Sequence, residues 1–112
     1  MGVANDRSIA WGIANALHKE GAELAFSYQG DAFGKRVKPL AESVGSDFLV
    51  DVDVTDDASL DACFASIAER WGKIDFLVHA IAYSDKNELT GRFINTSRAN
   101  FLNSLNISCY SL

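Results

Sequence analysis

The sequence is poor in cysteine, proline and long apolar runs, and each absence excludes a class of protein. Cys63 and Cys109 are the only cysteines, and they form no C-x-x-C spacing, so we expect neither a disulfide nor a cysteine metal site. No run approaches the roughly 20 apolar residues that cross a bilayer, and the first residues lack the apolar stretch of a signal peptide. We therefore expect a cytoplasmic protein with reduced thiols and no membrane partner.

Positive charge is also scarce. The formal net charge of −5 argues against a nucleic-acid partner or an anionic membrane held by bulk electrostatics. The one basic cluster, Lys35, Arg36 and Lys38, is typical of a solvated helix face.

Segments with the hydrophobic periodicity of a helix alternate along the chain with segments that have the alternating pattern of a strand. Helices are predicted from Ser8 to about Gly21, over residues 32–43, from Thr55–Asp57 to Trp71, and after a cap at Thr96 or Ser97. Strands are predicted over residues 22–28, 48–54 and 74–82, the last one apolar enough to be buried on both faces. Strands that alternate with helices indicate a parallel sheet. The predicted fold class is α/β, a Rossmann-like doubly wound parallel sheet.

The predicted sheet is incomplete. A glycine-bearing loop at residues 2–7 leads directly into a helix, whereas in a dinucleotide-binding unit a central strand precedes that loop. The segment Cys109–Leu112 also stops without a helix-stop signal. We therefore expect residues 1–112 to be a partial NAD-binding domain that lacks the first strand and the C-terminal half.

The helix that begins at Ser8 is a candidate anion site. Its first amides and the positive end of its dipole would suit a pyrophosphate, and the small residues from Gly2 onward would let a ligand approach. An ordinary capped helix after a flexible terminus explains the same residues equally well, and the general G-x-G-x-x-G fingerprint is absent.

Two strand ends carry candidate nucleotide ligands. An acid at the end of the second strand of such folds favours NADH and a nearby arginine favours NADPH, but Gln29 is neutral, so charge leaves the choice open. Asp53, at the end of the following strand, suits an adenine amino group. We expect no metal at the acidic cluster, because Asp51 and Asp53 share a strand face whereas Asp56 and Asp57 begin a helix.

No catalytic residue can be assigned. His18 and His79 have no neighbouring nucleophile in the sequence, and no Ser-His-Asp or Cys-His arrangement is present.

The chain resembles the bacterial NADH-dependent enoyl-acyl-carrier-protein reductases, divergent members of the short-chain dehydrogenase/reductase superfamily. The resemblance rests on several segments: Gly2-Val3-Ala4, Ser8-Ile9-Ala10-Trp11-Gly12-Ile13-Ala14, Gly21-Ala22-Glu23-Leu24-Ala25-Phe26, Tyr28-Gln29, Gly45-Ser46-Asp47, Asp53-Val54, His79-Ala80-Ile81 and Ile107-Ser108. It implies hydride transfer from NADH to the trans-2 double bond of an acyl chain on acyl carrier protein, in fatty-acid elongation, by a homotetramer.

The resemblance also implies roles for particular residues. Gly2, Ser8 and Ile9 would contact the pyrophosphate; Gln29 would lie beside the adenosine, and Asp53 with Val54 would hold the adenine. Ile81 would line the nicotinamide, and Ser84 would lie near the acyl substrate. Ala82 departs from the family, which usually has glycine there.

The family's catalytic tyrosine and lysine would lie beyond Leu112, so we expect the isolated chain to be inactive. The alternatives are another short-chain reductase, a non-catalytic nucleotide-binding or receiver-like module, and a misassembled product without function. The His79-Ala80-Ile81 segment argues against another short-chain reductase. The missing first strand argues against a nucleotide-binding or receiver-like module, which would need a complete sheet.

Overall fold

The computed structural model of the protein describes residues 1–111. They divide between two compact units, one of Met1–Ala80 and one that begins at Ile81. A single partial domain over residues 1–112 therefore stays a prediction. No helix among residues 1–111 combines the length and the apolar character needed to cross a membrane.

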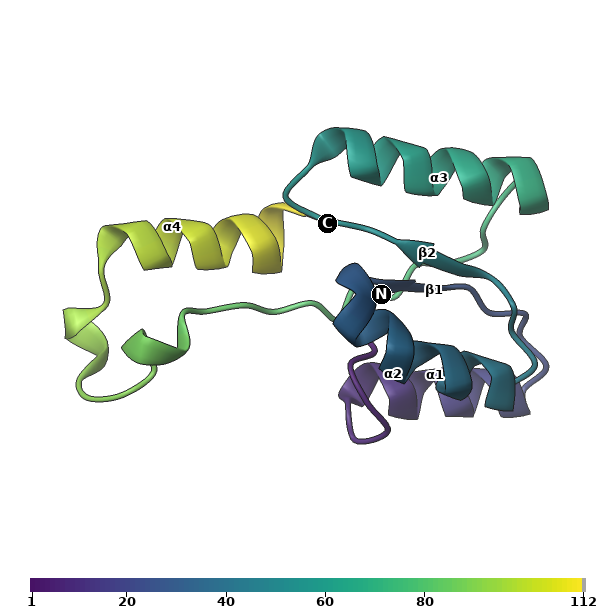
Figure 1. The fold of residues 1–112 in the computed structure, drawn as a ribbon, viewed down its shortest axis with the longest axis horizontal. Helices are drawn as coiled ribbons and strands as arrows, with labels where there is room; N and C mark the ends of the chain where they lie inside the picture. Colours follow the sequence, from purple (N-terminus) through teal and green to yellow (C-terminus); the bar gives the residue numbers. More distant parts are fainter. Residues whose placement is uncertain (112) are drawn as a thin grey trace. The chain divides into compact units, whose positions relative to one another are not determined.

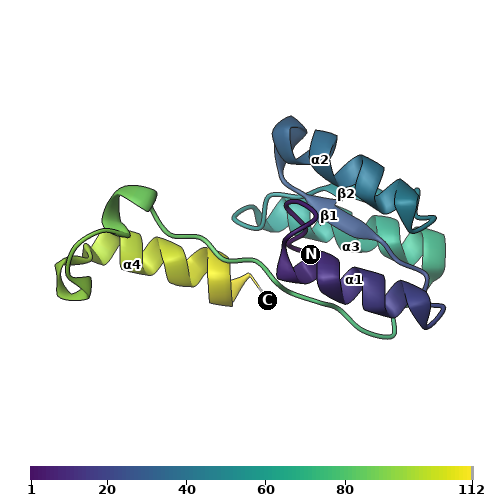
Figure 2. The ribbon, with the colours of Figure 1, turned by 90° about the horizontal axis from the view of Figure 1, so that it is seen from below.

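The first unit is built of three helices around two parallel strands. Its elements are α1 (Ile9–Lys19), β1 (Phe26–Tyr28), α2 (Gly30–Ser43), β2 (Leu49–Asp51) and α3 (Asp57–Trp71). The register pairs Phe26 with Leu49 and Tyr28 with Asp51. Helices α1 and α2 cover one face of the strand pair and α3 covers the other (Figures 1 and 2). This layering confirms the predicted α/β class.

The core of this unit lies between α1, α2 and β1. Val37 and Ala41 of α2 are fully buried, and the Trp11 ring of α1 packs on Phe26 of β1 at 6.3 Å between centroids. Burying these apolar side chains holds α1 and α2 on the strand pair.

The buried face of α1 carries a tryptophan and two alanines. Ala10, Trp11 and Ala14 are buried, whereas Ile9 is 81% exposed and Ile13 is 36% exposed. The side of α1 that meets the core of α2 and β1 is therefore the one with Ala10, Trp11 and Ala14.

The two strands are shorter than predicted. Outside the ladder of three residue pairs, the Leu24 carbonyl accepts a hydrogen bond from the Ser46 hydroxyl at 2.6 Å, and not from a strand amide. The hydroxyl therefore ties the two entering segments together where the ladder ends.

The helix boundaries agree with the sequence signals. The Asp56 carboxylate accepts a hydrogen bond from the Ala58 amide at 3.0 Å and so caps α3, as its first-turn acids predict. Pro39 lies inside α2, and the helix continues to Ser43.

The strand predicted over residues 74–82 is wrong for this structure. The segment is extended, but it forms no strand, and Phe76 is 53% exposed. Met1 lies beside it in a ladder-like arrangement: the Met1 amine donates to the Val78 carbonyl at 2.8 Å, and the Met1 carbonyl accepts from the Ala80 amide at 3.3 Å. A strand needs a partner along its length, and here that partner is one residue long.

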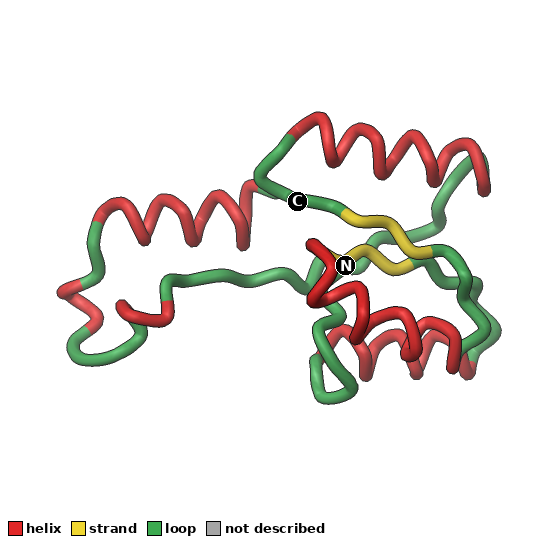
Figure 3. The backbone as a smooth tube through the Cα atoms, viewed as in Figure 1, coloured by secondary structure: helices red, strands yellow, loops and turns green. Residues whose placement is uncertain are grey.

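The second unit contains two 3-10 turns and one helix, α4 (Arg98–Leu105), which continues into a π-helical turn, Asn106–Tyr110 (Figure 3). The 3-10 turns are Lys86–Glu88 and Phe93–Asn95. Ser97 caps α4, as predicted, by accepting a hydrogen bond from the Asn100 amide at 3.1 Å. Glu88 in turn accepts from the Ser97 amide at 2.7 Å and fixes the start of the helix.

Candidate cofactor site

The candidate site lies at one edge of the first unit. Helices α1, α2 and α3 all begin at the edge where β1 and β2 end (Figures 1 and 2). Parallel strands joined by helical crossovers produce this arrangement, and ligands of open α/β sheets bind at the carboxyl ends of the strands. The positive ends of three helix dipoles therefore lie at the same edge.

The start of α1 is formed by a tight loop. Ser8 has the extended backbone of a helix N-cap, but its side chain does not cap the helix. Its hydroxyl instead donates to the Asn5 carbonyl at 2.7 Å and accepts from the Ala4 amide at 3.4 Å. The first amides of a helix have no carbonyl partner in a preceding turn, so those of α1 can face an anion.

Gly2 is needed for backbone packing. It has φ +98°, and a Cβ atom there would lie 2.2 Å from the Ala80 carbonyl oxygen. A side chain would therefore collide with the segment that pairs with Met1. This close approach explains the glycine without a ligand, and its contact with a pyrophosphate stays a prediction.

Asp53 follows β2, and a local turn holds it. Its Oδ1 accepts hydrogen bonds from the Thr55 amide at 2.9 Å and from the Thr55 hydroxyl at 2.7 Å. These bonds, with a smaller contribution from the Gln29 side chain, lower the pKa of Asp53. The structure thus brings Gln29 and Asp53 together and keeps the carboxylate charged, with Oδ2 able to accept from a ligand.

Asp51 lies at the same edge of the sheet and is a further candidate site residue, although the sequence pattern pointed to it only as a possible metal ligand. It is the last residue of β2, and its Oδ1 accepts a hydrogen bond from the Gly30 amide at 2.8 Å. Gly30 is the first residue of α2, so this carboxylate occupies the anion-binding end of that helix. Within residues 1–111, no group of three or more His, Cys, Asp or Glu residues could hold a metal ion.

The remaining predicted residues divide between the units. Ile9, at the opening of α1, is exposed, and Val54 is partly buried. Ile81 and Ser84 belong to the second unit, where the Asn100 side-chain amide donates to the Ser84 hydroxyl at 3.1 Å. The roles of Ile81 beside the nicotinamide and of Ser84 near the acyl substrate therefore stay predictions.

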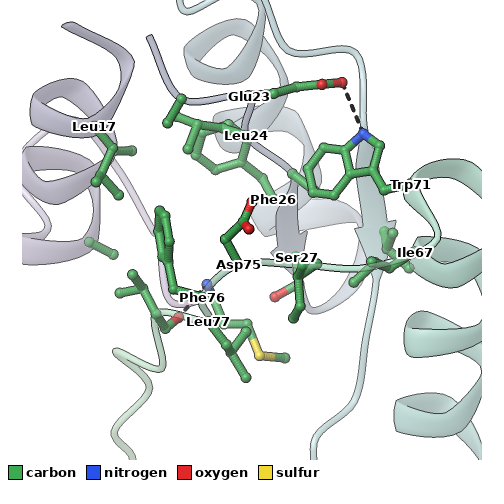
Figure 4. Close-up of a pocket in the computed structure, with 18 of the residues that line it drawn as sticks. Leu17, Glu23, Leu24, Phe26, Ser27, Ile67, Trp71, Asp75, Phe76 and Leu77 are labelled. Carbon is green, nitrogen blue, oxygen red and sulfur yellow. Dashed lines mark hydrogen bonds between the residues drawn. The ribbon is translucent and has the colours of Figure 1, made fainter. Parts of the chain in front are cut away.

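The first unit also contains an apolar cavity of about 390 Å³. It lies beside β1 and is shown in Figure 4 with Leu24, Phe26 and Leu77 in its walls. None of the predicted site residues lines it. The cavity is therefore a separate feature from the candidate cofactor site.

Comparison with known proteins decides the family. Residues 2–112 match the family described as "Enoyl-(Acyl carrier protein) reductase". The chain belongs to this family. It is 62% identical to NADH-dependent enoyl-[acyl-carrier-protein] reductase 2 of Rhizobium meliloti, over 99% of the chain and 41% of the relative. Identity to the FabI reductase of Bacillus subtilis is 49%, over 100% of the chain and 44% of the relative.

Solved structures of the reductase family share the fold. FabI from Candidatus Liberibacter asiaticus superimposes with a TM-score of 0.96 at 59% identity, over 99% of this chain and 43% of that one. The reductase of Anaplasma phagocytophilum, solved in complex with NAD, gives 0.93 at 57% identity, over 98% and 42%. The predicted Rossmann-like fold and family resemblance are thus confirmed, and the chain spans less than half the length of these relatives.

Proposed function

We propose that this chain supplies the adenosine and pyrophosphate part of the NADH site of an enoyl-acyl-carrier-protein reductase. The enzyme would transfer hydride from NADH to the trans-2 double bond of an acyl thioester carried on acyl carrier protein. Family membership supports this reaction. The observation that carries the proposal is that three groups lie at one sheet edge: the opening of α1, Gln29 directly before α2, and Asp53 directly after β2.

Each predicted residue has a place in this proposal. Gly2, Ser8 and Ile9 contact the pyrophosphate, Gln29 lies beside the adenosine, and Asp53 with Val54 holds the adenine. Ile81 lines the nicotinamide and Ser84 lies near the acyl chain. The proposal gives no residue of the chain a catalytic role, so we expect the isolated chain to bind nucleotide without reducing a crotonyl thioester.

Asp51 favours NADH over NADPH in this proposal. The 2′-phosphate of NADPH would need an amide-rich or basic site beside the adenosine ribose. The Asp51 carboxylate already accepts from the Gly30 amide at the start of α2, and it would repel a phosphate there. Arg36, the nearest arginine in sequence, places its guanidinium over the Phe33 ring at 5.9 Å.

Nucleotide titration of the chain, followed by NMR of backbone amides, tests the proposal. We expect 5′-ADP to shift the amides of Gln29, Gly30 and Asp53, and 2′,5′-ADP to bind at least about tenfold more weakly, a difference of about 1.4 kcal/mol. Asp51→Asn keeps an oxygen for the Gly30 amide but removes the charge, so the tenfold difference should shrink.

Two further variants complete this experiment. Asp61→Asn removes an equal charge from an exposed position of α3 and should leave the ratio of the two affinities unchanged. Asp53→Ala should weaken 5′-ADP binding. Absence of shifts at the sheet edge with millimolar 5′-ADP would refute the proposed site, whereas an unchanged ratio in Asp51→Asn would refute only the role of Asp51.

A further inference from the structure

Asp53 is held by separate hydrogen bonds on its backbone and on its side chain. On the backbone, its amide donates to the Ser59 hydroxyl of α3 at 3.0 Å, and its carbonyl accepts from the Asp56 amide at 3.1 Å. On the side chain, Oδ1 accepts from the amide and from the hydroxyl of Thr55. The position of Asp53 and the orientation of its carboxylate therefore depend on different partners.

The Thr55 side chain is not needed for the turn in which it lies. Thr55 is exposed, and the bond between Asp56 and Asp53 that closes the turn joins two peptide groups. The Asp56 carboxylate caps α3 through the Ala58 amide, again without Thr55. Replacing an exposed side chain changes stability little, so the main effect of the Thr55 hydroxyl falls on the Asp53 carboxylate.

Both donors of Thr55 act on the same carboxylate oxygen. The distances to Asp53 Oδ1 are 2.9 Å from the amide and 2.7 Å from the hydroxyl, so rotation of the carboxylate about its Cβ–Cγ bond would break both bonds. Oδ2 carries neither of these bonds, and each oxygen of an ionised carboxylate can accept. Thr55 therefore fixes which oxygen of Asp53 is left for a ligand.

The same two bonds keep the carboxylate ionised. The Thr55 hydroxyl makes the largest contribution to lowering the pKa of Asp53, and the Thr55 amide makes the second largest. An ionised carboxylate accepts hydrogen bonds but cannot donate them, so Asp53 suits an amino group and repels a carbonyl oxygen. Adenine carries an amino group at its 6-position, whereas hypoxanthine carries a carbonyl oxygen there.

We propose that Thr55 is a positioning residue of the cofactor site, whose hydroxyl orients Asp53 so that Oδ2 accepts from the adenine amino group and selects adenine over hypoxanthine. The inference rests on the proposed function, in which Asp53 holds the adenine. It adds the residue that sets the base selectivity of the site, and Thr55 itself makes no contact with the nucleotide.

Titration of the full chain with 5′-ADP and with 5′-IDP, followed by NMR of backbone amides, tests this proposal. The two nucleotides share the ribose and the diphosphate and differ in the base. We expect 5′-ADP to bind about tenfold more tightly, the effect of one hydrogen bond to a charged group. Thr55→Val removes the hydroxyl but keeps the β-branched shape, and it should reduce this ratio to about threefold or less, mainly by weakening 5′-ADP.

Two further variants locate the effect. Thr55→Ser keeps a hydroxyl at the same position and should restore the ratio of the unmodified chain. Thr90→Val makes the same chemical change at an exposed position of the second unit and should leave the ratio unchanged. In Thr55→Val the pKa of Asp53, followed by carbon-13 NMR of its carboxyl group, should also rise, because a hydrogen bond that lowers it is lost.

The results distinguish this inference from the proposed function. An unchanged ratio in Thr55→Val would overturn the role of Thr55, and so would an equal loss of affinity for both nucleotides, which would indicate a general structural effect. Failure of Thr55→Ser to restore the ratio would also overturn it. Absence of 5′-ADP binding to the unmodified chain would instead refute the proposed cofactor site, and the role of Thr55 with it.

Discussion

Strand β1 pairs with β2 along one edge and has an open edge on the other side. Apolar residues on the two sides of β1 lie in different environments. On the paired side, α2 packs on β1 and β2, and its Val37 and Ala41 are completely buried. On the other side, Ile74, Phe76 and Leu77 are 36%, 53% and 40% exposed, although their segment is the most apolar run in the chain. The residues on both sides of β1 are hydrophobic. The sides differ in that β2 forms a ladder with β1 on one of them.

This contrast shows that burial of a strand depends on its neighbours. A helix satisfies its own backbone groups and needs a partner only for one face, whereas an extended segment needs a hydrogen-bonding neighbour before its side chains can be covered. Stability of the first unit is therefore expected to be concentrated on the α1–α2–β2 side.

Polar substitutions should separate the two sides of β1 most strongly. We expect Val37→Asp to lower the free energy of unfolding by on the order of 4 kcal/mol, because it buries a carboxylate without a partner. Phe76→Ser, on the open edge, should change it by less than about 0.5 kcal/mol, as surface substitutions usually do. Urea unfolding monitored by circular dichroism measures both, and similar losses for the two variants would remove the contrast.

A methyl group at Gly2 should have the next largest effect. Gly2→Ala forces a side chain into positive φ and against the Ala80 carbonyl oxygen, so we expect a loss of about 2 to 3 kcal/mol. Gly21→Ala is the matched control: Gly21 also has positive φ, +86°, but nothing lies within 4 Å of its Cβ position.

The control separates two causes. Gly21→Ala should cost only the conformational part, about 1 kcal/mol. If the two variants lost equal stability in urea unfolding, the contact between Met1–Gly2 and residues 78–80 would contribute nothing, and the start of the ladder at the open edge would be unimportant.

The sequence predicted the helices well because their signals are local. Asp56 before α3 and Ser97 before α4 act as caps in the structure, and these caps depend on residues two or three positions away. The strand over residues 74–82 failed for the opposite reason: its pairing depends on what lies beside it, and a hydrophobic run carries no information about that.

The proximity of two candidate residues was predictable from the sequence, whereas their roles stay predictions. Gln29 and Asp53 came from their positions after predicted strands, and the structure brings them together. The role proposed for Asp51 could not be predicted from spacing, because its hydrogen bond reaches Gly30 across 21 positions. The alternating pattern of the second strand placed Asp51 on the same face as Asp53, and that was the only signal in the sequence.

The smallest effect concerns pH. Burial lowers the pKa of the Met1 amine below its ordinary value of about 8. The unfolded chain keeps the ordinary pKa and binds more protons between the two values, so stability should rise with pH through that window and level off above about pH 8, with a slope of at most about one proton. As pH falls through the window, this contribution is lost.

N-terminal acetylation sharpens this prediction, because it removes the titrating amine and leaves the rest of the chain unchanged. Urea unfolding from pH 6 to 9 should therefore show a steeper rise for the free amine than for the acetylated chain. Parallel curves for the two forms would mean that the amine is as well solvated in the folded chain as in the unfolded one. Met1 would then not be buried at the end of the open edge, and the two edges of β1 would differ less than the structure indicates.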